Sequence, residues 1–221
     1  MEHIDTKAII LNVLDYTDSQ LIVNAYTSEM GRIAFITSKK INKINLKVLL
    51  QPLFLVEISF KNNNKKEVQR INNLCIWKPY TNIPQNHAKI IISLFLSELL
   101  SKTFREQIPN IELFNFCVDS FLVFDRTSSN PNTFLLSFMI HLAKYLGFYP
   151  TFGIVSAEKL YKVNQTIVTL LNQLLENSVQ DFEKISLSNY QFQTILSLLI
   201  EYYQKNIPIG PLKSYSFLSQ L

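Results

Sequence analysis

The chain has 221 residues, of which 48% are hydrophobic and 17% charged, so it is long enough to bury a real core and is not a disordered chain. It has only four scattered glycines, which excludes the clustered-glycine phosphate loops of nucleotide-binding enzymes. The net charge of +4 arises in residues 1–80, which hold 11 Lys and Arg against 7 Asp and Glu, whereas residues 81–221 hold 10 of each. This asymmetry favours a polyanionic partner for the first third of the chain.

Residues 7–77 show the period-two alternation and short apolar runs of β-strands. The predicted strands lie around Ile9–Val13, Leu21–Ala25, Ile33–Phe35, Leu49–Phe60 and Val68–Ile76. Five short strands joined by basic loops predict an OB-type barrel, and an SH3-like barrel fits the strand count almost as well. Glu57 is a carboxylate inside an apolar strand, and we expect it on a solvated outer face.

Two of the connections between these strands are basic, Ser38–Lys47 and Lys61–Glu67. The loops and open face of an OB fold commonly bind oligonucleotides. We therefore predict that DNA contacts the basic residues of this region, which are Arg32, Lys39, Lys40, Lys43, Lys47, Lys61, Lys65, Lys66 and Arg70. The alternative is that these residues are simply solvated hairpin loops.

After Pro79 the apolar spacing becomes helical. The first predicted helix carries an apolar stripe from Ala88 to Thr103, with Lys89, Ser93, Ser97 and Lys102 on its solvent side. Further helices are predicted from Asn110, from Asn130-Pro131 to Gly147, over 165–176, and over 190–205. The predicted fold is thus α+β with two domains: an OB-type five-stranded β-barrel over 1–79 and an all-α helical bundle over 80–221.

The sequence contains no arrangement that predicts catalysis or a cofactor. The three histidines, His3, His87 and His141, have no metal-ligand spacing, and no serine has the glycine-flanked turn of a nucleophile. Cys75 and Cys117 each lie in an apolar run, which predicts buried free thiols in a reducing cytoplasm. No apolar stretch is long enough to span a bilayer. We therefore expect a cytoplasmic protein that is not an enzyme and binds no metal.

Several segments, in this order, resemble the RecO family of recombination mediators. They are Tyr26–Arg32 (YTSEMGR), Leu50–Leu53 (LQPL), Ser97–Phe116 (SELLSKTFREQIPNIELFNF), Leu146–Phe148 (LGF) and Pro211–Ser214 (PLKS). None of them is specific alone, but their order and spacing cover nearly the whole chain.

The resemblance implies an N-terminal OB fold, a helical C-terminal domain and a role in recombinational repair without nucleotide hydrolysis. It implies binding to single- and double-stranded DNA, annealing of complementary strands, and association with RecR at the nucleoid. It also implies that the protein engages the acidic C-terminal tail of the single-stranded-DNA-binding protein. We hypothesise that this tail docks on the helical domain, where Arg105, Lys205 and Lys213 are candidate contacts; the alternative is that these scattered basic residues simply face water.

The sequence departs from the family pattern at two places. Many relatives carry four zinc-binding cysteines after the LG segment, but residues 151–165 contain none, so we expect no zinc. The basic loop after the third strand holds lysines only, which favours contact with the DNA backbone without reading its sequence. Without the resemblance, two alternatives remain: an adaptor that binds only proteins, and an RNA-binding OB module.

Overall fold

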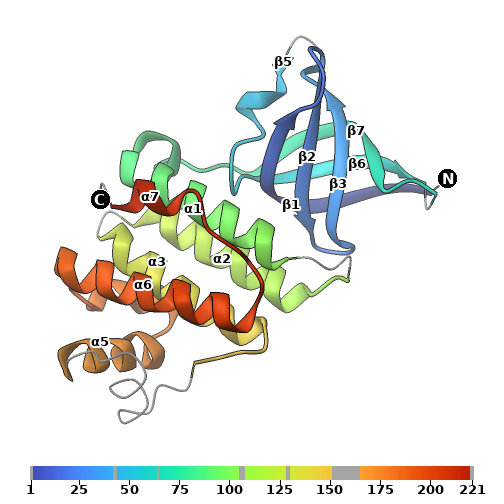
Figure 1. The fold of residues 1–221 in the computed structure, drawn as a ribbon. Coiled ribbons are helices and arrows are strands. Elements are labelled where there is room, and N and C mark those ends of the chain that lie inside the picture. Colours follow the sequence, from blue (N-terminus) through green and yellow to red (C-terminus); the bar gives the residue numbers. More distant parts are fainter. Residues whose placement is uncertain are drawn as a thin grey trace.

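The computed structural model describes residues 2–41, 44–63, 65–104, 108–127, 130–150 and 165–219, and places a barrel beside a group of helices (Figure 1). The barrel strands are β1 (Glu2–Asp15), β2 (Gln20–Thr27), β3 (Gly31–Ser38), β6 (Leu55–Asn62) and β7 (Val68–Lys78). They close in the order β1-β2-β3-β7-β6, with β3 and β7 parallel and the other pairs antiparallel. This is the Greek-key arrangement of an OB fold, which confirms the predicted barrel.

The barrel interior is built by strict alternation along the strands. In β3, Ile33 and Phe35 point inward and are buried, whereas Ala34 and Ile36 point outward and are half-buried. A β-bulge between Ile10 and Asn12 interrupts this alternation in β1. Ile10 and Val13, three residues apart, therefore both face the barrel interior, and Leu11 between them packs against the helices.

The basic segment after β3 is folded against the end of the barrel. It contains the short strands β4 (Lys40–Ile41) and β5 (Ile44–Asn45), followed by the 3-10 turn η1 (Leu46–Val48). Leu46 and Leu50 are both 3% exposed and belong to the core of the barrel. These two apolar anchors fix the backbone from which the lysines of the segment project.

The outer surface of β6 and β7 carries polar side chains. Glu57 is exposed, as expected, and lies between Lys7 and Cys75 in the strand register. Cys75 is also exposed, so the prediction of a buried thiol is wrong there and right for Cys117. The apolar neighbours of Cys75 in sequence, Leu74 and Ile76, alternate with it and face the other side of the strand.

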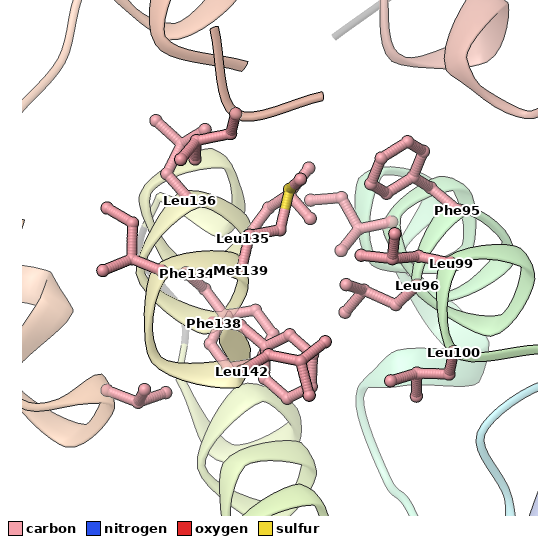
Figure 2. Packing of buried hydrophobic residues seen from close by; sticks show 14 of the residues in the cluster. Phe95, Leu96, Leu99, Leu100, Phe134, Leu135, Leu136, Phe138, Met139 and Leu142 are labelled. Carbon is pink, nitrogen blue, oxygen red and sulfur yellow. The ribbon is translucent and has the colours of Figure 1, made fainter. Parts of the chain in front are cut away.

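The helices follow the predicted pattern closely. The structure gives α1 (His87–Thr103), α2 (Ile111–Arg126), α3 (Pro131–Tyr145), α5 (Gln165–Glu176), α6 (Asn189–Asn206) and α7 (Tyr215–Leu218), with 3-10 turns η2 (Ile83–Gln85) and η3 (Val179–Lys184). Asn110 caps α2 by accepting a hydrogen bond from the Leu113 N–H. Pro131 begins α3. Figure 2 shows Phe95, Leu96 and Leu99 of α1 facing the side chains of α3.

One hydrophobic cluster joins the barrel to the helices. Ile9, Leu11, Tyr26 and Leu55 leave the barrel surface and are buried in the same cluster as the helix residues. The Tyr26 ring lies 4.4 Å from that of Phe104, measured between centroids. The last barrel strand ends at Lys78, but the hydrophobic cluster continues from the barrel into the helices. The barrel and the helices therefore pack as one body.

Helix α1 is buried on more sides than its sequence predicts. Lys89, Ser93 and Ser97 are 3–4% exposed although we predicted them on the solvent side, whereas Ile90 and Leu94 are 38% and 41% exposed. The reason is the position of α1, which packs against β1, η2, α3 and α7. A helix surrounded by other elements has no wide solvent face, so its polar side chains must find partners inside.

Two of these polar side chains find their partners on distant segments. The Lys89 ammonium donates hydrogen bonds to the carbonyls of Asp125 and Thr127, at 2.9 and 2.6 Å, at the C-terminal end of α2. Burial lowers the pKa of Lys89, although the nearby Asp125 opposes the shift. The Ser97 hydroxyl donates to the carbonyl of Leu11 and so ties α1 to the barrel.

Glu98 holds the C-terminal segment against α1. Its carboxylate accepts hydrogen bonds from the N–H groups of Lys213 and Ser214, at 3.0 and 2.8 Å, and pairs with Lys102 at 3.2 Å. Two of the segments that carried the family resemblance, SELL and PLKS, therefore meet at this carboxylate. Burial alone would raise the pKa of Glu98, but the hydrogen bonds from Ser214 and Lys213 outweigh it and lower the pKa from 4.5 to about 2.

Replacing Glu98 with glutamine should therefore destabilise the protein by about 1–3 kcal/mol at pH 7, because hydrogen bonds to a charged acceptor are lost. Since the folded-state pKa lies below the ordinary value, this stabilisation is full above about pH 4.5 and disappears as the pH falls toward 2. Urea unfolding at pH 7 and pH 3 tests this: the difference between wild type and Glu98→Gln should narrow at pH 3. Glu176→Gln, an exposed carboxylate at the end of α5, is the control. A difference that stays constant with pH would contradict this role for the charge.

Candidate nucleic-acid interface

One part of the outer barrel surface is left open by the helices. Leu14, Ile22, Ile36 and Arg70 are consecutive register partners across β1, β2, β3 and β7, and we call this row the outer strip. Leu14 is 58% exposed, and Tyr16, in the turn after β1, is 60% exposed. The strip combines apolar surface, an accessible aromatic ring and a guanidinium, which are the groups that hold stacked bases and phosphates.

Three of the predicted lysines gather at one end of the outer strip. The ammonium groups of Lys39 and Lys47 contact the two oxygens of Asp15 at 2.7 and 2.9 Å. These hydrogen bonds lower the pKa of Asp15, which therefore stays ionised and holds both lysines beside the β1–β2 turn. Lys40, in β4, is exposed nearby in the chain. Three lysines against the two carboxylates of Asp15 and Asp18 leave this end of the strip with a net positive charge.

The second group of predicted basic residues lies around the β6–β7 connection. Arg70 is at the far end of the outer strip, opposite Ile36. Lys65 and Lys66 line a cavity of about 490 Å³ that also contains the carboxylates of Glu29 and Glu67. Lys61 is paired with His3 in the register and so lies on the β1–β6 surface. Of this second group, the structure thus brings Arg70 to the strip, whereas Lys61 lies on the β1–β6 surface and Lys65 and Lys66 lie at the cavity.

The side chain that orders the β6–β7 connection is Gln69, which is 7% exposed. Its amide donates to the carbonyls of Asn63 and Lys66, at 3.1 and 2.7 Å, and accepts from the Asn63 N–H at 3.0 Å. A buried amide that bridges both ends of a turn fixes its backbone. Sequence reasoning did not single out Gln69, because a lone glutamine gives no signal of the turn it will span.

Arg32 has a different environment from the other predicted residues. Its guanidinium donates to the carbonyls of Ser101 and Phe104, at 2.7 and 3.1 Å, at the C-terminal end of α1. The last carbonyls of a helix lack intrahelical donors and carry partial negative charge, so an arginine satisfies both needs. In this structure Arg32 joins the barrel to α1.

Of the three residues predicted to contact a partner peptide, the structure describes Lys205 and Lys213. Lys205 pairs with Glu201, one turn earlier on α6, at 2.8 Å. Lys213 is exposed beside α1, where its backbone N–H is held by Glu98. Arg105, like Lys43 of the basic loop, lies outside the described residues.

Within the described ranges, no three His, Cys, Asp or Glu side chains lie close enough together to hold a metal ion. His3 is 3.9 Å from Asp5, and His141 Nδ1 contacts the carbonyl of Ser137 at 2.8 Å. Burial lowers the pKa of His141. No helix in the same ranges combines the length and hydropathy needed to cross a membrane.

Comparison with known proteins places the chain in a family. Residues 1–80 match the family model described as "Recombination protein O N terminal", and residues 84–153 match "Recombination protein O C terminal". The DNA repair protein RecO of Bacteroides fragilis is 31% identical over an alignment that covers 98% of each chain. The chain belongs to the RecO family. RecO proteins of Azobacteroides pseudotrichonymphae (29% identical, 90% of each chain) and Caldicellulosiruptor saccharolyticus (26% identical, 69% of this chain and 62% of the relative) also match.

The family assignment confirms the resemblance found in the sequence. The zinc motif of many RecO proteins corresponds to residues 151–165, which lie almost entirely outside the described ranges. That segment contains no cysteine or histidine, so its side chains do not fit a zinc ion that needs thiolate ligands.

Proposed function

We propose that this RecO protein is a non-catalytic mediator of DNA repair and homologous recombination at the nucleoid. In this proposal it binds single- and double-stranded DNA, anneals complementary strands and, together with RecR, helps to load the recombinase onto DNA coated by the single-stranded-DNA-binding protein. The observation that carries the proposal is the outer strip of an OB barrel with lysines at one end and Arg70 at the other.

The chemistry of the strip suits a strand held by its backbone. Ammonium groups neutralise phosphates without the fixed bidentate geometry of arginine, so Lys39, Lys40 and Lys47 tolerate any sequence. Tyr16 and Leu14 offer surfaces on which bases stack. Annealing follows because two strands with neutralised phosphates repel one another less, while their pairing edges stay free.

The proposed protein partners are RecR and the acidic tail of the single-stranded-DNA-binding protein. We propose that the tail contacts the helical part, with Arg105, Lys205 and Lys213 as the candidate cations. To bind the tail, Lys205 must give up its ion pair with Glu201 and pair with a carboxylate of the tail instead. A tail peptide should therefore bind less tightly to Lys205→Gln and Lys213→Gln than to wild type.

The DNA proposal is tested by salt-dependent binding of a labelled single-stranded oligonucleotide, with fluorescence anisotropy as the readout. If about four phosphates are neutralised, the logarithm of the affinity should fall with the logarithm of the salt concentration at a slope near −3. The triple variant Lys39→Gln, Lys40→Gln, Lys47→Gln should reduce this slope by about 2, because about 0.7 is lost per phosphate contact.

The control removes three exposed lysines from the helices: Lys144→Gln, Lys184→Gln and Lys205→Gln change the net charge equally. This control should keep the wild-type slope. If both triple variants reduced the slope equally, only the net charge of the protein would matter. If the variant at Lys39, Lys40 and Lys47 kept the wild-type slope, the DNA path would lie elsewhere. An RNA oligonucleotide of the same sequence, bound more tightly than DNA, would favour an RNA-binding module.

A further inference from the structure

The cluster of Asp15, Lys39 and Lys47 is carried by three chain segments that main-chain hydrogen bonds tie together. The Lys39 N–H donates to the carbonyl of Ser19 in the β1–β2 turn at 2.8 Å. The Lys39 carbonyl accepts from the N–H of Leu46, the first residue of η1, at 2.9 Å. The end of β3, the β1–β2 turn and η1 are therefore joined through the backbone of Lys39.

The backbone of Lys47 is fixed as well. Its N–H donates to the side-chain oxygen of Asn45 at 3.1 Å, and its carbonyl accepts from the side-chain amide of Gln51. Leu46, the residue before it, is anchored in the core of the barrel. None of these contacts involves Asp15. Both lysines would therefore keep their place at the end of the barrel without its carboxylate.

The carboxylate of Asp15 lies between the two ammonium groups. Its Oδ1 is 2.7 Å from Lys39 Nζ, and its Oδ2 is 2.9 Å from Lys47 Nζ. A phosphodiester carries the same single negative charge and also presents two oxygens on one central atom, and ammonium groups bind both kinds of anion at similar distances. Two ammonium groups placed around the oxygens of a carboxylate are thus also placed to bind those of a phosphate.

The cluster is open to solvent and lies beside the groups that we assigned to the bases. The side chains of Asp15 and Lys47 are 57% and 46% exposed, and that of Lys39 is 27% exposed. Leu14 and Tyr16, on either side of Asp15 in the sequence, are both exposed. A strand with a base against either of them can therefore bring the adjoining phosphate to the cluster.

We propose that Lys39 and Lys47 form a phosphate-binding subsite that the carboxylate of Asp15 fills in the free protein, so that an incoming phosphodiester must displace Asp15. Hydrogen bonds from Lys39 and Lys47 lower the pKa of Asp15, so its carboxylate is charged at neutral pH and competes with the phosphate. The inference rests on the proposed function, because it takes the phosphate from a DNA strand. It adds an anion of the protein itself that limits how tightly the strand is bound.

Two other roles for Asp15 predict different behaviour. If Asp15 positioned the lysines for DNA, its removal would weaken DNA binding. If it acted only through the net charge of the protein, another carboxylate close by would have the same effect. Asp18 provides this comparison, because it is exposed in the same turn and its side chain makes no hydrogen bond or ion pair with any residue that the structure describes.

The test compares wild type, Asp15→Asn and Asp18→Asn in anisotropy titrations of a labelled single-stranded oligonucleotide at about 50 to 200 mM salt. Asp15→Asn should steepen the salt dependence by about 0.7, because the two lysines then neutralise one further phosphate charge. If the affinities converge near about 1 M salt, this variant binds about fivefold more tightly at about 0.1 M. Asp18→Asn should gain less than about twofold, because salt screens a charge that touches neither lysine.

Two further variants show whether the gain passes through the lysines. Asp15→Ala, which introduces no amide that could itself bind a phosphate, should gain as much as Asp15→Asn. In a chain that also carries Lys39→Gln and Lys47→Gln, Asp15→Asn should gain less than about twofold, because the subsite is gone. Unchanged or weaker DNA binding by Asp15→Asn, an equal gain for Asp18→Asn, or the full gain without the two lysines would overturn the inference.

A second readout does not depend on DNA. The side-chain carboxyl resonance of Asp15 is followed by NMR while inorganic phosphate replaces chloride at constant ionic strength, with the resonance of Asp18 as the control. If no variant binds DNA, the proposed function fails and this readout decides the inference alone. A shift of the Asp15 resonance only would then support a subsite for phosphate from another source, and equal or absent shifts would overturn the subsite as well.

Discussion

Replacing Asp125 with alanine should lower the free energy of unfolding by about 3–5 kcal/mol, the largest effect expected for a polar residue of this chain. Asp125 is 5% exposed and accepts hydrogen bonds from the N–H groups of Thr81, Asn82 and Ile83, at 2.9, 2.8 and 2.8 Å. Burial alone would raise the pKa of Asp125, but the hydrogen bonds from these three residues outweigh it and lower the pKa. Alanine would leave three N–H donors without their acceptor at the connection between barrel and helices, and the one on Ile83 is buried.

Urea unfolding followed by circular dichroism at pH 7 measures this effect. Asp119→Ala, an exposed carboxylate on the same helix, is the matched control and should change stability by less than about 0.5 kcal/mol. The loss of unfolding free energy for Asp125→Asn should lie between the losses for Asp125→Ala and Asp119→Ala. The asparagine amide keeps one acceptor oxygen, but its NH₂ group faces an N–H donor. A loss below about 1 kcal/mol for Asp125→Ala would show that water replaces the carboxylate.

Replacing Gly31 with alanine should cost about 2–5 kcal/mol, for two separable reasons. Gly31 has φ of +67°, a left-handed conformation that disfavours a side chain by about 1–2 kcal/mol. A Cβ atom there would also lie 2.7 Å from the carbonyl oxygen of Ile108, in the connection between α1 and α2. Because the obstacle is backbone, it cannot rotate away.

Gly210 provides a control that isolates the second reason. Its φ is +61°, nearly that of Gly31, but a Cβ atom there would meet nothing within 4 Å. Gly210→Ala should therefore cost only about 1–2 kcal/mol. The difference between the two variants in thermal or urea unfolding measures how tightly the β2–β3 turn packs on the helical part. Equal losses of unfolding free energy for Gly31→Ala and Gly210→Ala would mean that the β2–β3 turn moves away readily from the connection between α1 and α2.

The sequence by itself determined the local elements and the uneven charge. The alternation of Ile33 and Phe35 predicted a strand because a sheet buries every second side chain, and the structure buries both residues. Asn110 and Pro131 predicted helix starts. The Asn110 side chain accepts a hydrogen bond from a free N–H group of the first turn, and Pro131 has no N–H group to satisfy; both effects involve only residues close in sequence. The clustered lysines likewise required no knowledge of the fold.

Tertiary structure alone decided which polar groups are used internally. Lys89 is buried because its ammonium meets the carbonyl of Thr127, 38 residues away, and Arg32 joins α1 through Phe104, 72 residues away. The spacing of apolar residues shows which face of a single helix is buried and which is exposed. It therefore predicts that a lysine outside the apolar stripe faces solvent. Burial on several sides depends on packing between elements distant in the chain. The same packing closes the barrel through the parallel pairing of β3 with β7, and it leaves Ser93 without a partner.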